Sequence, residues 1–246
     1  HAAADLGYEV LVSFQEHEDD WQHEFSVAHR VDGLILLGYG DYTKSRSKLA
    51  LLEKSGYHYV LWGPQDPDTP AITVGCNNIE GGRLATQHLL DRGCSRILFL
   101  GSTSAANPEL AARYEGYITA LGQNGLSVDP NLKIESENEE NEAFEAVEKA
   151  ISSKLSFDGI FAVTDKMAIS ALRALQQAGK VIPDDIKVVG FDDLPVSAYV
   201  TPRLTTVRQD VHLAGEHLVN TLVRKIAGNQ VSSTIMQPRL VVRDSA

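Results

Sequence analysis

Short apolar runs alternate along the chain with longer segments in which apolar residues recur at helical spacing. Runs of about four to eight residues between turn signals are typical of strands buried in a parallel sheet. Glycines such as Gly93 and Gly125 follow the longer segments, as expected where helices end. We expect strands at 8–14, 32–37, 57–62, 72–74, 96–100, 133–135, 158–163, 187–191, 204–207 and 235–242, and helices at 19–30, 43–55, 78–92, 108–124, 141–153, 166–178 and 211–227.

This alternation predicts an α/β fold with doubly wound parallel sheets, because each strand is followed by a helix that returns the chain to the same edge. The chain opens on a short helical stretch at residues 2–6, before Gly7, instead of on a strand. A doubly wound sheet is built outward from a central first strand. We therefore expect that first strand, with most of a helix, upstream of residue 1.

Composition narrows the class of protein. The chain has 246 residues, 43% of them hydrophobic, enough to bury the core of one large or two small domains. Its net charge of −11 argues against nucleic-acid binding by these residues, because phosphate contacts need clustered lysine and arginine. Cys76 and Cys94 are too few for a disulfide framework and indicate a reducing compartment. No apolar run approaches the ~18 residues of a membrane span.

A carboxylate at a strand end is the first candidate for ligand binding. Asp192 follows the apolar run 187–191, and ligands of open α/β sheets bind at the carboxyl ends of the strands. Asp193 is adjacent, so the two side chains should point in opposite directions and cannot form an acid/base pair. Capping of a turn is the alternative role for both residues.

Arg113 is the second candidate. It lies in the first turns of the helix predicted at 108–124, where a positive charge gains nothing from the helix dipole. A guanidinium group binds pairs of oxygen atoms in one plane, so we expect Arg113 to contact a ligand. The alternative is a surface salt bridge to Glu109 or Glu115.

Catalytic motifs are missing from the sequence. Residues 38–40 form only part of a G-x-G-x-x-G, and there is no P-loop, no H-E-x-x-H or C-x-x-C, and no G-x-S-x-G. We therefore predict no catalytic residue, no metal and no cofactor. The candidates fit a binding protein better than an enzyme.

Six phrases in a fixed order then carry a family resemblance: residues 30–36, 77–93, 113–117, 163–168, 190–193 and 202–210. Together they resemble the effector-binding region of the LacI/GalR family of bacterial transcription regulators. The resemblance implies two periplasmic-binding-protein-like subdomains of type I, joined by three crossovers, with the ligand between them. It also implies a helix-turn-helix head upstream of residue 1, through which alone operator DNA would be bound.

The resemblance places the crossovers near residues 102–105, 207–210 and 232–235. The first subdomain would contain residues 1–102 and 208–231, and the second would contain residues 103–207 and 232–246.

Four further residues are candidates for ligand contact. Thr164 stands at a strand end where the family commonly has asparagine, and Asp165 beside it should cap the following helix. Gln209 lies on a crossover, where its alternative role is that of a hinge residue. Glu80 lies near the pocket rim, and its alternative role is that of an acid in the first turn of a helix. Asn138 stands where sugar-binding members carry an aromatic residue. We expect an aromatic face from one of Trp62, Tyr39, Tyr42 and Phe191 instead.

The resemblance also implies the partners. We expect a sugar or sugar derivative as the effector, with a purine as second candidate, and a cytoplasmic homodimer without membrane contact. The dimer interface would contain Leu84, His88, Tyr199 and Val200. The alternative is a periplasmic sugar-binding protein of a transport or chemotaxis system. That alternative predicts a signal peptide upstream, where a regulator predicts a basic helix-turn-helix.

Overall fold

The computed structural model describes residues 2–13, 31–37, 42–65, 71–136 and 140–246. Its contacts divide the chain into two compact units. Unit 1 contains His1–Cys76 and Asp210–Met236, and unit 2 contains Asn77–Gln209 and Gln237–Ala246. The chain therefore passes three times from one unit to the other.

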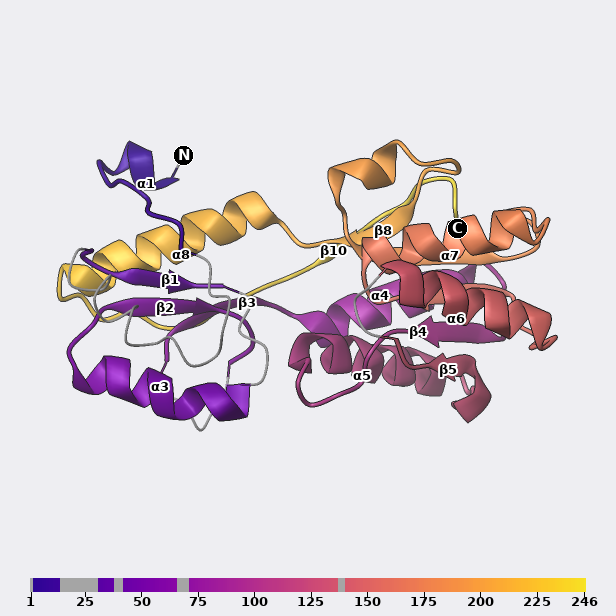
Figure 1. Ribbon diagram of the computed structural model, residues 1–246, viewed down its shortest axis with the longest axis horizontal. Helices are drawn as coiled ribbons and strands as arrows, with labels where there is room; N and C mark the ends of the chain where they lie inside the picture. Colours follow the sequence, from indigo (N-terminus) through magenta and orange to yellow (C-terminus); the bar gives the residue numbers. More distant parts are fainter. Residues whose placement is uncertain (1, 14–30, 38–41, 66–70, 137–139) are drawn as a thin grey trace. The chain divides into compact units, whose positions relative to one another are not determined.

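Unit 1 is built on a four-stranded parallel sheet with the order β1-β2-β3-β9. Helices α3 and α8 lie on its two faces (Figure 1). The short helix α1 precedes the sheet in sequence. The bounds are α1 Ala2–Asp5, β1 Leu34–Leu36, α3 Tyr42–Lys54, β2 Tyr59–Trp62, β3 Thr73–Cys76, α8 Val211–Ile226 and β9 Thr234–Met236.

Strand β2 shows why this sheet needs helices on both faces. Its side chains alternate between the faces, as in any strand. Tyr59 and Leu61 cluster with Leu49 and Leu52 of α3, whereas Val60 belongs to the cluster that contains α8. A continuous apolar run is therefore buried on both sides, which is the pattern that its sequence predicts.

Unit 2 contains a six-stranded sheet with the order β10-β8-β7-β6-β4-β5. The helices, 3-10 helices (η) and strands of unit 2 are α4 Asn78–Asp91, β4 Ile97–Leu100, α5 Pro108–Gln123, η1 Pro130–Leu132, β5 Lys133–Ile134, α6 Glu140–Ser152, β6 Gly159–Ala162, α7 Asp165–Gln177, β7 Lys187–Asp192, η2 Pro195–Ala198, β8 Thr205–Arg208 and β10 Arg239–Val241. Figure 1 shows α6 and α7 on one side of the sheet and α5 on the other. On the α5 side, the Phe99 ring packs 4.7 Å from the Tyr114 ring and 5.4 Å from the Tyr117 ring.

The predicted α/β class with doubly wound parallel sheets is confirmed, but two strands differ from prediction. Residues 8–13 pair with no described strand, and Val10, Leu11 and Val12 remain 66–72% exposed. Residue 14 and the helix expected at 19–30 lie outside the described residues. None of the helices that the structure describes is long and apolar enough to cross a membrane.

The single strand expected at 235–242 is two strands in two different sheets. β9 pairs with β3 in unit 1, and β10 pairs antiparallel with β8 in unit 2. Pro238 lies between them and has no N–H to donate to a ladder. β10 is therefore an antiparallel edge strand on an otherwise parallel sheet.

The first crossing also differs from prediction. It lies at Cys76–Asn77 instead of near residue 102, because β4 pairs with β5 and β6 and α4 packs on α5. The later crossings lie at Gln209–Asp210 and Met236–Gln237. The third follows β9, since that strand completes the sheet of unit 1.

Helices α4 and α5 pack backbone to backbone through two glycines. A Cβ atom on Gly82 would lie 2.0 Å from the carbonyl oxygen of Arg113, and one on Gly116 would lie 2.1 Å from that of Ile79. Both obstacles are backbone atoms, which cannot turn aside as a side chain can. The crossing therefore brings the backbone at Arg113 directly against the beginning of α4.

We predict that Gly116→Ala lowers the free energy of unfolding by about 1–3 kcal/mol, because the added methyl group overpacks this crossing. Gly122→Ala in the same helix is the matched control, since nothing lies within 4 Å of its Cβ position. This control should raise the stability by about 0.5–1 kcal/mol, as expected for alanine in a helix. Urea denaturation measures the free energy of unfolding of both variants. Equal changes in the two would contradict the close packing of α5 on α4 at Gly116.

Candidate functional site

Arg113 is held from several sides within unit 2. The residue is 5% exposed, which excludes a role in a surface salt bridge. Its Nε donates a hydrogen bond to Asn78 Oδ1 over 2.9 Å, and its Nη1 donates to the Val163 carbonyl. The guanidinium carbon lies 3.7 Å from the centroid of the Phe191 ring, and Nη1 lies 3.6 Å from Asp192 Oδ1. The plane of the guanidinium is thus fixed by the protein.

Asp192 ends β7 and meets Arg113 there. Its side chain is 26% exposed, and its Oδ1 accepts a hydrogen bond from Gln209 Nε2 over 2.7 Å. Burial raises the pKa of this carboxyl, while the charge of Arg113 and the Gln209 hydrogen bond act in the opposite direction. Arg113, Asp192 and Gln209, three of the predicted ligand residues, therefore form one cluster, which we call the strand-end cluster.

Asp193 serves different partners. Its carboxylate is 5% exposed and accepts hydrogen bonds from Arg208 Nε and, over 2.6 Å, from Arg243 Nη2. Burial alone would raise the pKa of Asp193, but the bonds from the two arginines outweigh it and the pKa lies below its usual range. The two adjacent carboxylates thus have separate partners, and Asp193 ties the turn after β7 to β8 and to the C-terminal segment.

The structure corrects the capping role predicted for Asp165. Thr164 is the N-cap of α7, and its side chain accepts a hydrogen bond from the Met167 N–H over 3.3 Å. Asp165, the expected cap, is instead the first helical residue, and its side chain is completely buried. Thr164 directly follows the carbonyl that accepts from Arg113, so it lies beside the strand-end cluster.

Glu80 is not brought to the strand-end cluster by any described contact. Its carboxylate accepts hydrogen bonds of 2.6 and 2.7 Å from Arg83, one turn further along α4. That pairing lowers the pKa of Glu80 and matches the first-turn helix acid considered as its alternative role. Asn138, the remaining ligand candidate, lies outside the described residues.

The aromatic candidates are only partly described. The Phe191 ring is buried beneath the Arg113 guanidinium. Trp62 is half-buried and packs against the core of unit 1. Tyr39 and the side chain of Tyr42 lie outside the described part of the chain.

Sequence reasoning missed Asn78. Two asparagines open α4, and the first of them, Asn77, is the N-cap, with its side chain accepting from Glu80 N over 3.1 Å. The second is 7% exposed and binds Arg113. Because one cap is enough for a helix, the second asparagine was the signal that could have revealed this partner.

The residues expected at a dimer interface differ in exposure. Tyr199 is 85% exposed. Leu84 and Val200 are partly buried against the core of unit 2. His88 Nε2 is buried and has no hydrogen-bond partner within the described residues, and burial lowers the pKa of this imidazole.

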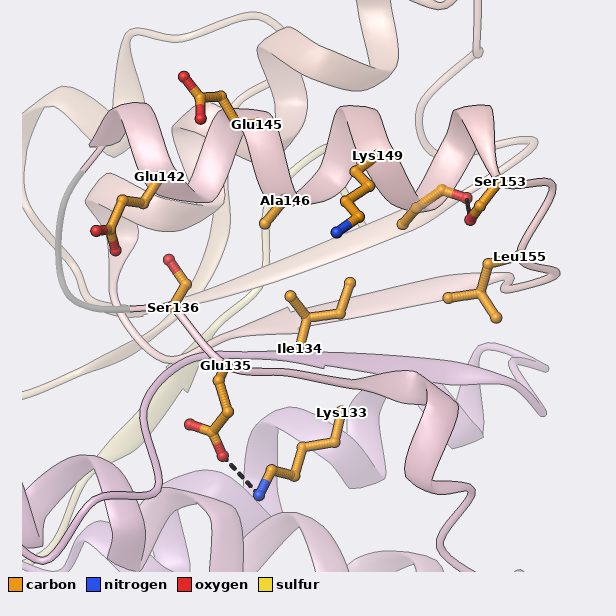
Figure 2. A pocket seen from close by; sticks show the side chains of 11 residues that line it. Lys133, Ile134, Glu135, Ser136, Glu142, Glu145, Ala146, Lys149, Ser153 and Leu155 are labelled. Carbon is orange, nitrogen blue, oxygen red and sulfur yellow. Dashed lines mark hydrogen bonds and ion pairs between the residues drawn. The ribbon is translucent and has the colours of Figure 1, made fainter.

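A cavity of about 620 Å³ lies elsewhere in unit 2, between β5 and α6 (Figure 2). Ile134 and Ala146 line it together with charged residues such as Lys149 and Glu142. None of the described residues of the strand-end cluster lines it. Among the described residues, no group of histidine, cysteine, aspartate or glutamate is arranged to hold a metal ion.

We predict that Asp193→Asn lowers the free energy of unfolding at pH 7 by about 1–3 kcal/mol, because two arginine partners lose a charged acceptor. A depressed carboxyl pKa stabilises the fold above the unfolded pKa of about 4 and loses this effect as the pH falls through the folded pKa. The difference between variant and wild type should therefore shrink below pH 4 in urea denaturation.

The matched control is Asp244→Asn, which removes the exposed ion pair with Arg203. Its effect should be much smaller, since solvent screens that pair. Equal losses in the two variants would contradict the role given to Asp193.

Comparison with known proteins agrees with this architecture. A profile described as "Periplasmic binding protein-like domain" matches residues 86–246. The ribose operon repressor of Escherichia coli (strain K12) is 31% identical over 245 residues, which cover 98% of this chain and 73% of the repressor. The HTH-type transcriptional repressor PurR of Aliivibrio salmonicida (strain LFI1238) is 32% identical, over 97% of this chain and 72% of the PurR chain.

A solved structure of the transcriptional regulator CelR in complex with cellobiose matches with a TM-score of 0.89 and 27% identity. The match covers 100% of this chain and 76% of that one. These relatives are transcription regulators and not enzymes, as the sequence predicts for this chain. The chain belongs to the LacI family of transcription regulators and is the effector-binding core of such a repressor.

Proposed function

We propose that the chain senses a sugar or sugar derivative through the strand-end cluster of Arg113, Asp192 and Gln209, with Thr164 beside it. The observation that carries this proposal is the contact of the fixed Arg113 guanidinium with Asp192, whose side chain is partly exposed. A guanidinium donates and a carboxylate accepts, so the pair complements neighbouring hydroxyl groups. The names of two relatives, a ribose operon repressor and a regulator bound to cellobiose, support a carbohydrate.

A purine is the second candidate, and aromatic stacking separates it from a sugar. A base is commonly held between aromatic faces, but Phe191 is covered by Arg113 and position 138 carries asparagine. The described polar groups of the strand-end cluster therefore favour a ligand that is bound mainly by hydrogen bonds.

The same cluster lies close in sequence to the chain crossings. Gln209 is the last residue of unit 2 before the second crossing, and Asn78, which holds Arg113, is the second residue after the first. A ligand with different affinity for two arrangements of the units shifts the balance between them. A coupling free energy of about 1–3 kcal/mol is sufficient for regulation. In the whole cytoplasmic regulator, we propose, this shift controls binding of operator DNA.

We predict that a sugar raises the melting temperature in a panel of D-ribose, cellobiose, adenine, guanine and hypoxanthine. A ligand at about 100 times its Kd adds about 2.7 kcal/mol to the free energy of unfolding. Asp192→Ala is the control: it should show no shift relative to its own melting temperature without ligand. A shift with purines alone would overturn the sugar assignment. An unchanged shift in Asp192→Ala would remove this residue from the site.

We further propose that the chain forms a homodimer through the segment 195–200 and the outer face of α4. Tyr199 and Val196, in or beside η2, are 85% and 46% exposed. Two-fold symmetry suits a regulator that reads palindromic half-sites. The partial burial of Leu84 and Val200 leaves Tyr199 as the residue on which this interface depends most.

We predict that light scattering gives twice the chain mass of 26.8 kDa and that Tyr199→Glu gives a monomer. A charge placed at the centre of an apolar interface is strongly unfavourable. Val181→Glu is the matched control and should stay a dimer. Val181 is also an exposed apolar residue, at 55%, but it precedes β7 in the chain and is not part of the proposed interface. A wild-type monomer at micromolar concentration would disprove the dimer.

A further inference from the structure

The buried carboxylate of Asp165 joins three segments of unit 2. Its Oδ2 accepts hydrogen bonds from the Leu194 N–H over 2.8 Å and from Ser197 Oγ over 2.5 Å. Its Oδ1 accepts from Thr206 Oγ1 over 2.5 Å. Asp165 begins α7, whereas its partners belong to the turn after β7, to η2 and to β8. This carboxylate therefore connects elements that are distant in sequence.

The fold leaves space for this carboxylate through a glycine. A Cβ atom on Gly190 of β7 would lie 2.4 Å from Asp165 Oδ1. Leu204 and Ala168 close the same space, at 3.0 and 3.1 Å from that Cβ position. Only glycine at position 190 lets the Asp165 side chain approach β7 in this way.

The turn held by Asp165 is the one that presents Asp192. Both Asp192 and Asp193 have left-handed backbones, with φ angles of +112° and +57°. Such backbones are unfavourable for non-glycine residues and persist where their surroundings determine them. Asp193 is held by its arginines, and the next residue, Leu194, is held by Asp165.

We propose that Asp165 is a positioning residue for effector recognition: its carboxylate fixes the turn 192–194 and so sets the place of the Asp192 carboxylate. This inference rests on the proposed function, in which Asp192 contacts the effector. Asp165 itself is completely buried and acts through the turn.

The electrostatics of Asp165 agree with a role other than stabilisation. Burial raises its pKa to about 6, against the hydrogen bonds from Ser197, Thr206 and Leu194, and the charge of Asp192 raises it further. The charged residue of the neighbouring strand β8, Arg208, forms its ion pair with Asp193, so the donors to Asp165 named above are all neutral. A raised carboxyl pKa stabilises the fold below the unfolded pKa of about 4, and this stabilisation is lost as the pH rises through 6. At pH 7 the ionised carboxylate is therefore a burden on stability.

The first experiment needs no ligand. The side-chain amide of Gln209 donates to Asp192, so its NMR signals report where the Asp192 carboxylate lies. In the wild-type 246-residue chain, the Leu194 amide signal should titrate with a midpoint near pH 6. Asp165→Asn should abolish this titration and shift the Gln209 side-chain signals. Unchanged Gln209 signals in this variant would overturn the proposal.

Asp129→Asn is the matched control. Asp129 also accepts from a backbone N–H, that of Asn131, but it lies before the edge strand β5, three strands away from β7, which carries Asp192. This variant should leave the Gln209 signals unchanged.

The second experiment measures affinity for D-ribose and cellobiose by calorimetry at pH 7. Asp165→Asn should weaken binding of the sugar that the wild type takes by about tenfold, the effect of losing one charged hydrogen bond. Its melting temperature should not fall, because the neutral amide removes a buried charge. In a variant that still folds, a joint loss of melting temperature and affinity would indicate a merely structural role and would overturn the proposal.

Two further variants, Thr206→Val and Ser197→Ala, keep the carboxylate and remove one donor each. They should shift the Gln209 signals in the same direction as Asp165→Asn, which keeps the test decisive if that variant does not fold. If neither sugar binds the wild type, the sugar assignment fails, whereas the NMR experiment still decides whether Asp165 positions Asp192.

Discussion

The close crossing of α4 and α5 is the constraint on which the candidate site depends. Gly82 and Gly116 let the two backbones touch, and Gly81 leaves room for the Phe191 ring, which a Cβ atom there would meet at 2.4 Å. Arg113 leaves α5 at this contact and reaches Asn78 of α4 and the end of β6. A wider crossing would move the guanidinium away from all of these partners. The position of the Arg113 guanidinium is therefore prepared by residues that have no side chain.

Three carboxylates gather around the ends of β6 and β7, and each has its own partners. Asp165 takes neutral donors, Asp193 takes two arginines, and Asp192 shares Arg113 and Gln209. Buried charge is tolerated in proteins when its hydrogen bonds are satisfied. The Asp192 side chain is the most exposed of the three, at 26%, compared with 5% for Asp193 and 0% for Asp165. This division of partners agrees with the proposed function, which assigns Asp192 and neither of the other two carboxylates to the ligand.

Local patterns were sufficient to predict most elements and to single out Asp192 and Arg113 as candidates. Strand ends can be recognised from short apolar runs, and parallel strands bring their ends to one edge of a sheet. The sheet that each strand joins could not be predicted, because strand pairing depends on residues far away in sequence. The split of residues 235–242 and the misplaced first crossing have this cause. The capping role given to Asp165 failed for a related reason, since its partners are 29 to 41 residues away.

The left-handed backbone of Asp192 has a consequence for evolution. Glycine would adopt the φ angle of +112° without strain, so relief of backbone strain favours its appearance at position 192. Asp193 differs, because its two arginine partners retain the carboxylate for stability. Under the proposed function, selection for ligand recognition opposes glycine at position 192, because glycine carries no carboxylate. In a lineage that no longer senses an effector, that opposing pressure disappears and position 192 should drift toward glycine.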